Sequence, residues 1–114
     1  MSELNISHKV VSGVSVGGVE GRLDLQGAGV VEAYAEQRFN AGESRLVLNL
    51  AGVDYISSAG LRAILAATKR LKEKQGRLHL ASLKSVVREV FDISGFSSII
   101  PIFESVDAAI SGLK

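Results

Sequence analysis

The feature that most restricts the fold is a change of hydrophobic periodicity between residues 45 and 71. In residues 45–50 (RLVLNL), leucine recurs at every second position, which is the spacing of one face of a β-strand. From Leu61 onward, Ile64, Leu65, Thr68 and Leu71 instead continue a stripe with helical spacing. A strand that leads into an amphipathic helix is the repeating unit of α/β proteins, so we expect a sheet with parallel strand pairs and right-handed crossovers.

The same two spacings recur along the rest of the chain and define the other elements. They predict strands over residues 4–10, 14–20, 45–50, 77–82 and 98–103, and helices over residues 31–39, 61–74, 83–91 and 106–113. Ser12-Gly13 is expected to turn the first strand back on the second, and Gly76 and Gly95 to stop helices. Residues 98–103 are assigned to an edge strand, because Pro101 cannot donate a hydrogen bond to a neighbouring strand.

The order of elements, ββαβαβαβα, predicts the fold class. We expect an α/β fold with a mixed four- to five-stranded sheet packed with about four helices. The 114 residues, of which 46% are hydrophobic and 22% charged, fit one globular domain over residues 1–114.

Composition excludes several classes of function. The net charge of +1 is too small to indicate a nucleic-acid partner, and the basic run at residues 69–77 reads as a solvated helix face. The chain has no cysteine, which removes disulfides and thiolate chemistry. No apolar run approaches the length of a membrane helix or a signal peptide, so we expect a cytoplasmic protein without membrane contact.

Motifs for metal, nucleotide or hydrolytic chemistry are weak. His8 and His79 lie in strand patterns without metal-ligand spacing, and the glycines of residues 15–21 (SVGGVEG) lack the spacing of a phosphate loop. We therefore expect no metal, cofactor or catalytic residue. A small hydrolase that uses Ser58 with His79 as base stays as an alternative, although Ile56 and Gly60 stand where a nucleophile elbow has glycines.

Two adjacent serines, Ser57 and Ser58, precede the helix that begins near Leu61. Serine is a favoured N-cap, which explains one of them without any chemistry. Glycine in a first helical turn costs about 1 kcal/mol relative to alanine, so Ala59-Gly60 suggests that a partner or an enzyme approaches closely here. A phosphate would be tolerated at this place, because helix N-termini favour anions. One serine could therefore be phosphorylated without unfolding the domain.

Three segments resemble the STAS domain, and more closely the stand-alone bacterial anti-sigma factor antagonists, also called anti-anti-sigma factors. They are VEGRLD at 19–24, LVLNLAGVDYISSAGLRAIL at 46–65 and VREVFDISGFSSIIPIFES at 87–105. The middle segment is the most specific. It reads as a hydrophobic strand, a short acidic loop, and a serine two residues before Gly-Leu at a helix start.

The resemblance implies that Ser58 is the phosphoacceptor, with Ser57 as second choice. It implies a partner-binding surface made of Asp24, Ser57, Ser58, Ala59, Gly60, Leu61 and Arg62. The unphosphorylated protein would bind an anti-sigma factor that is also a serine protein kinase. Phosphorylation would release that partner, and a PP2C-type phosphatase would reset the switch.

The chain departs from well-known members of this family at two positions. Ser57 stands where they have aspartate, and Ala59 where they have serine or threonine. The missing acidic neighbour leaves the identity of the kinase open. A STAS subunit that scaffolds a transporter or sensory complex without phosphorylation stays as the alternative function.

Overall fold

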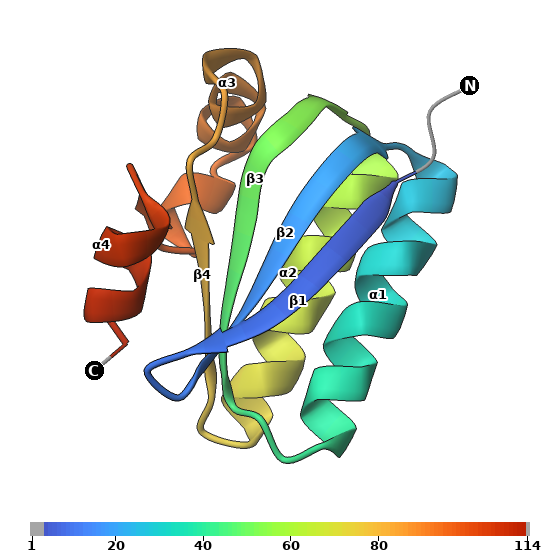
Figure 1. Cartoon of the computed structure of the whole chain (residues 1–114). Coiled ribbons are helices and arrows are strands. Elements are labelled where there is room, and N and C mark those ends of the chain that lie inside the picture. The colour runs from blue at the N-terminus through green and yellow to red at the C-terminus, as the bar shows by residue number, and fades with distance from the viewer. Residues whose placement is uncertain (1–3, 114) are drawn as a thin grey trace.

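The computed structural model describes residues 4–113, which form one mixed sheet and its covering helices (Figure 1). The strands are β1 (Asn5–Val11), β2 (Val14–Leu23), β3 (Arg45–Ile56), β4 (Arg77–Ala81) and β5 (Ile102–Phe103); the helices are α1 (Leu25–Asn40), α2 (Ser58–Glu73), α3 (Ser85–Ser94), the short 3-10 helix η1 (Phe96–Ser98) and α4 (Val106–Ser111). The strand order is β1-β2-β3-β4-β5. Only β1 and β2 are antiparallel, and the other neighbours are parallel. The predicted fold class and element order are confirmed.

The β1–β2 hairpin fixes the antiparallel edge of the sheet. Its two turn residues, Ser12 and Gly13, have φ angles of 53° and 78°. Two consecutive positive φ angles are the mark of a type I′ turn, whose twist matches that of the flanking strands. The turn places Val11 opposite Val14 and so sets the register of the whole pair.

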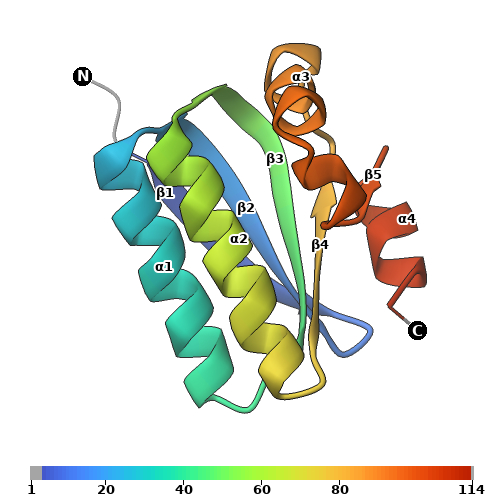
Figure 2. The same cartoon turned by 180° about the vertical axis from the view of Figure 1, so that it is seen from behind.

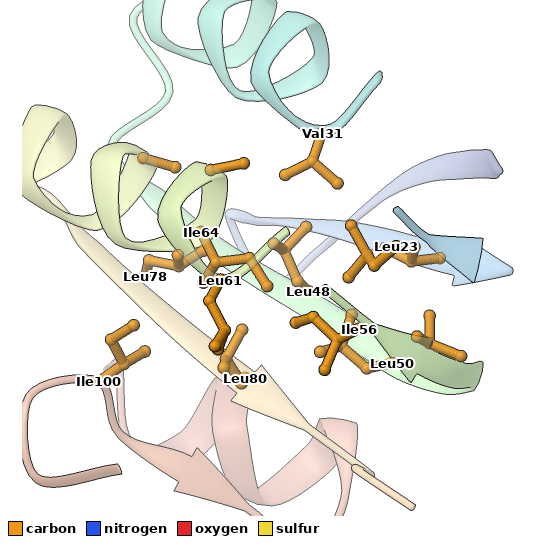
Figure 3. Packing of buried hydrophobic residues seen from close by; sticks show 14 of the residues in the cluster. Leu23, Val31, Leu48, Leu50, Ile56, Leu61, Ile64, Leu78, Leu80 and Ile100 are labelled. Atoms are coloured by element: carbon orange, nitrogen blue, oxygen red, sulfur yellow. The ribbon is translucent and has the colours of Figure 1, made fainter. Parts of the chain in front are cut away.

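The helices form two layers on the sheet (Figure 2). Helices α1 and α2 lie together over one face, where Leu61 and Ile64 of α2 point toward Leu48 of β3 (Figure 3). On the other face α4 covers a smaller apolar cluster that includes Val47 and Ile110. The alternation in β3 serves both layers, as expected for a parallel strand buried on both sides.

Several predicted boundaries are wrong. Strand β2 runs to Leu23, three residues beyond its predicted end, and α1 begins at Leu25, six residues before its predicted start. Residues 98–103 do not form one strand, because η1 reaches Ser98 and only Ile102–Phe103 pair with β4. Pro101 lies just before β5, where its carbonyl accepts a hydrogen bond from the Leu80 N–H at 2.9 Å and no donor is needed from it. The short acidic loop expected before the two serines is also part of the sheet, since β3 continues without a break to Ile56.

Smaller differences concern the first strand and the end of α2. The apolar face predicted for β1 is not buried throughout, since Val10, just before the hairpin turn, is 60% exposed. Helix α2 ends in a Schellman-type arrangement, but Gln75 takes the left-handed conformation, with φ of 62°, in place of Gly76. The Gly76 N–H donates to the Leu71 carbonyl at 2.7 Å.

Candidate functional site

The candidate site lies where β2 and β3 end side by side. Leu23 and Ile56, the last residues of these two parallel strands, are paired, and each strand turns directly into a helix. Asp24 is the N-cap of α1, and its carboxylate accepts a hydrogen bond from the Gly27 N–H at 2.9 Å. The N-termini of α1 and α2 therefore open at the same edge of the sheet, the usual place for a site in an open α/β sheet.

Ser57 is the N-cap of α2, and its hydroxyl is fully used within the fold. The oxygen accepts from the Gly60 N–H at 3.2 Å, while the hydroxyl proton is donated to the Leu23 carbonyl at 3.1 Å. The Ser57 backbone N–H donates to the same carbonyl at 2.9 Å. Ser57 thus ties the start of α2 to the end of β2, and modification of its oxygen would break this junction.

Ser58 occupies the first position of α2 and, unlike Ser57, takes no part in the hydrogen bonds that join α2 to β2. Its side chain is exposed, and within residues 4–113 its hydroxyl forms no hydrogen bond. A group added to the Ser58 oxygen would therefore displace no contact of the fold. It would lie beside the free N–H groups and the positive end of the dipole of α2.

The expectation that Ala59-Gly60 provides clearance for an enzyme is wrong for Gly60. Gly60 is buried, and a Cβ atom there would lie 2.6 Å from the Leu23 carbonyl oxygen. The small residue is needed so that the first turn of α2 can pack against the end of β2. Leu61 is likewise a core residue with 8% exposure, whereas Arg62 is exposed.

Further side chains at this edge were not singled out from the sequence. The Arg22 guanidinium lies 4.0 Å from the centre of the Tyr55 ring and 3.9 Å from the Asp24 carboxylate. Leu25, the first residue of α1, is 76% exposed, and Tyr55 is 41% exposed. An exposed arginine that stacks on an exposed aromatic ring is typical of a protein-binding surface, where both residue types are enriched. The alternation within β2, which turns Arg22 away from buried Leu23, was the available signal.

The histidines serve structure. His79 lies under α4, where its Nδ1 donates to the Ala109 carbonyl at 3.0 Å and its ring stacks on Phe103. Burial lowers the pKa of His79. Since Ser58 starts a helix on the opposite face of the sheet, His79 cannot act as its base, and the hydrolase alternative is dropped. Residues 4–113 contain no cluster of three or more side chains suited to hold a metal ion.

Comparison with known families decides the classification. The family model described as "STAS domain" matches residues 5–109, which is nearly the whole chain. The chain belongs to the STAS domain family. As the sequence predicted, Ser57 and Ser58 lie at the start of α2, the helix that follows β3.

Named relatives of this STAS domain are regulators. It is 43% identical over 104 residues to the "Putative anti-sigma factor antagonist BtrV" of Bordetella bronchiseptica, covering 91% of this chain and 90% of that one. In structure it is similar to an anti-sigma factor antagonist from Mycobacterium paratuberculosis, with a TM-score of 0.88, 22% identity and coverage of 97% and 94%. It also matches the Bacillus cell fate determinant SpoIIAA in its phosphorylated form, with a TM-score of 0.73, 19% identity and coverage of 98% and 100%.

Relatives of this chain are named as antagonists of anti-sigma factors and not as enzymes, in agreement with the expectation that the chain is not an enzyme. Within residues 4–113, no helix combines the length and the apolar character needed to cross a membrane.

Proposed function

We propose that this STAS domain is an anti-sigma factor antagonist whose binding to its partner is switched off by phosphorylation of Ser58. The observation that carries the proposal is the division of labour between the two serines. Ser57 is engaged in hydrogen bonds of the fold, whereas Ser58 is exposed at the first position of α2. The names of the relatives support the class of function, and SpoIIAA provides an example of this fold in a phosphorylated form.

The switch works through charge and not through unfolding. Transfer of a phosphoryl group from ATP to the Ser58 oxygen releases the hydroxyl proton and adds about −1.5 to −2 charges. The dipole and free N–H groups of α2 partly balance this charge, so the domain stays folded. A partner docked over the same edge, which also carries the Asp24 carboxylate, would have to desolvate the new dianion, and its affinity would fall.

The partner in this scheme is an anti-sigma factor that is itself a serine protein kinase. Its contact surface would include Asp24, Ser58 and Arg62, with Ser57 and Ala59 partly accessible between them. Buried Gly60 and Leu61 would act indirectly, by fixing the start of α2. A PP2C-type phosphatase would remove the phosphate and restore binding. This cycle requires ATP, so we propose that the protein acts in the cytoplasm.

The test compares two aspartate variants in binding to the cognate anti-sigma factor by titration calorimetry. Ser58→Asp should weaken binding at least tenfold. Ser111→Asp is the control for an added charge, because Ser111 is an exposed residue of α4, which packs on the opposite face of the sheet from α2. Equal binding of Ser58→Asp and the wild type, or equal losses in both variants, would refute the proposed surface.

A further inference from the structure

The outer edge of β1 is unpaired within the part of the chain that the structure describes. The hairpin turn fixes which backbone groups point outward. Val11 and Val14 flank a two-residue turn, so their backbone groups hydrogen-bond to each other. Hydrogen-bonded pairs recur at every second residue, so Lys9, Ser7 and Asn5 also direct their N–H and C=O groups toward β2. The N–H and C=O groups of the intervening residues, Ile6, His8 and Val10, therefore face away from the sheet.

A groove without charged side chains lies beside this edge, between β1 and the outer side of α1. Its volume is about 480 Å³. It is lined by Leu4, Asn5, Ile6, Gln26, Gly29, Val30, Ala33, Tyr34 and Gln37. None of these nine carries a charge, although 22% of the chain is charged. We call the outer edge of β1 and this groove together the β1 edge surface. Figure 1 shows β1, in dark blue, next to α1 at the open side of the sheet.

We infer that the β1 edge surface binds a second copy of the chain, by antiparallel pairing of β1 with β1. This inference is independent of the proposed function. All three outward-facing residues can pair with their counterparts in another copy only in a register centred on His8, where Ile6 lies opposite Val10 of the other copy. The same register places Lys9 opposite Ser7, so the two Lys9 side chains are not opposed. The edge is thus complementary to itself, as a two-fold interface requires.

Side-chain positions agree with this register. Val10 is 60% exposed and lies on the same face of β1 as Ile6, so it would cover the apolar end of the groove in the other copy. His8 does not obstruct the two-fold axis, because its ring is held against its own α1. Its Nε2 accepts from the Arg38 guanidinium at 2.7 Å, which leaves Nδ1 to donate to the Tyr34 hydroxyl at 2.8 Å.

The position of this interface leaves the Ser58 edge free. Ser58 follows the carboxyl end of β3, whereas the pairing groups line the outer side of β1, with β2 between the two strands. A dimer formed in this way would present two copies of the Ser58 edge. An extended segment of another protein would need the same backbone groups, and a groove without charge offers no electrostatic means of selecting one.

Cysteine cross-linking tests the register directly, because the natural chain contains no cysteine. In the inferred pairing, Ser7 and Lys9 of opposite copies form a non-hydrogen-bonded pair with a Cα separation of about 4.5 Å, within the range of a disulfide. A mixture of Ser7→Cys and Lys9→Cys should therefore give a disulfide-linked heterodimer under mild oxidation. Each variant alone should not, since its copies are diagonal neighbours roughly 7–8 Å apart. Equal cross-linking in the single variants, or none in the mixture, would overturn the register.

Light scattering over a concentration series tests the dimer without cysteines. The mass should rise from 12.0 kDa toward twice that value for the wild type and for Val10→Thr, which keeps the outward N–H. Val10→Pro removes that N–H without breaking a β1–β2 hydrogen bond, and it should stay monomeric while its circular dichroism spectrum remains that of the wild type. A wild type that stays at 12.0 kDa at every concentration would overturn the inference, as would a dimer that tolerates a folded Val10→Pro.

Discussion

Replacement of each of the two serines by alanine should have very different effects on stability. Ser57→Ala removes the N-cap of α2, which is worth about 1 kcal/mol, and also the bond from its hydroxyl to the Leu23 carbonyl. That carbonyl still accepts from the backbone N–H of residue 57, so it is not left unpaired. We therefore expect Ser57→Ala to lower the free energy of unfolding by about 1–2 kcal/mol.

Ser58→Ala removes an exposed hydroxyl that contributes no hydrogen bond within the described residues. Alanine is the best helix former, so the expected change is within about 0.5 kcal/mol and could be stabilising. Urea denaturation of both variants and the wild type under one buffer measures the difference. A loss of 1.5 kcal/mol would lower the Tm of Ser57→Ala by roughly 5–10 °C. If Ser58→Ala lost as much as Ser57→Ala, the division of roles between the serines would be refuted.

Three other changes test the packing of the fold. Gly60→Ala should lower the free energy of unfolding by at least about 2 kcal/mol in urea denaturation, because its Cβ would meet the Leu23 carbonyl. Gly29→Ala, on open helix surface, should raise it by about 0.5–1 kcal/mol. The reverse order would contradict the close packing of Gly60 against the end of β2. Gln75→Gly should raise the free energy of unfolding by up to about 1 kcal/mol, because glycine adopts the left-handed conformation of this position without strain. A lower free energy of unfolding would contradict the assignment of strain to Gln75. Burial lowers the folded-state pKa of His79 below its unfolded value of 6.5, so the unfolded chain binds more protons and stability should fall as pH drops below about 6.5. His79→Asn, which can keep the bond to the Ala109 carbonyl, should show a smaller fall in denaturation melts between pH 8 and 5, and an unchanged pH profile would contradict this assignment.

The spacing of hydrophobic residues in the sequence predicted most of the elements, because buried residues recur with the period of a strand or of a helix along most of the chain. It failed at the end of β3 for a physical reason. Between Asn49 and Gly52, and again between Val53 and Ile56, β3 has one residue more than β2, which marks two β-bulges. Each extra residue shifts the alternation by one position, so the strand no longer shows a period of two.

The candidate site was predictable only in part. The positions of Ser57 and Ser58 at a helix start followed from propensity and from resemblance to the family. The role of Gly60 did not, because the atom that excludes a side chain there is the Leu23 carbonyl, on a different strand. The contact of Arg22 with Tyr55 likewise depends on the pairing of β2 with β3, which no local pattern specifies.

The most direct test of the central claim is to locate the phosphate. Wild type, Ser57→Ala and Ser58→Ala should be incubated with the cognate kinase and ATP, then analysed by intact mass and by fragment mapping. The account predicts that wild type and Ser57→Ala gain one phosphoryl group, about 80 Da, on Ser58, and that Ser58→Ala gains none. Undiminished phosphorylation of Ser58→Ala, or a phosphate mapped to Ser57 in the wild type, would contradict it.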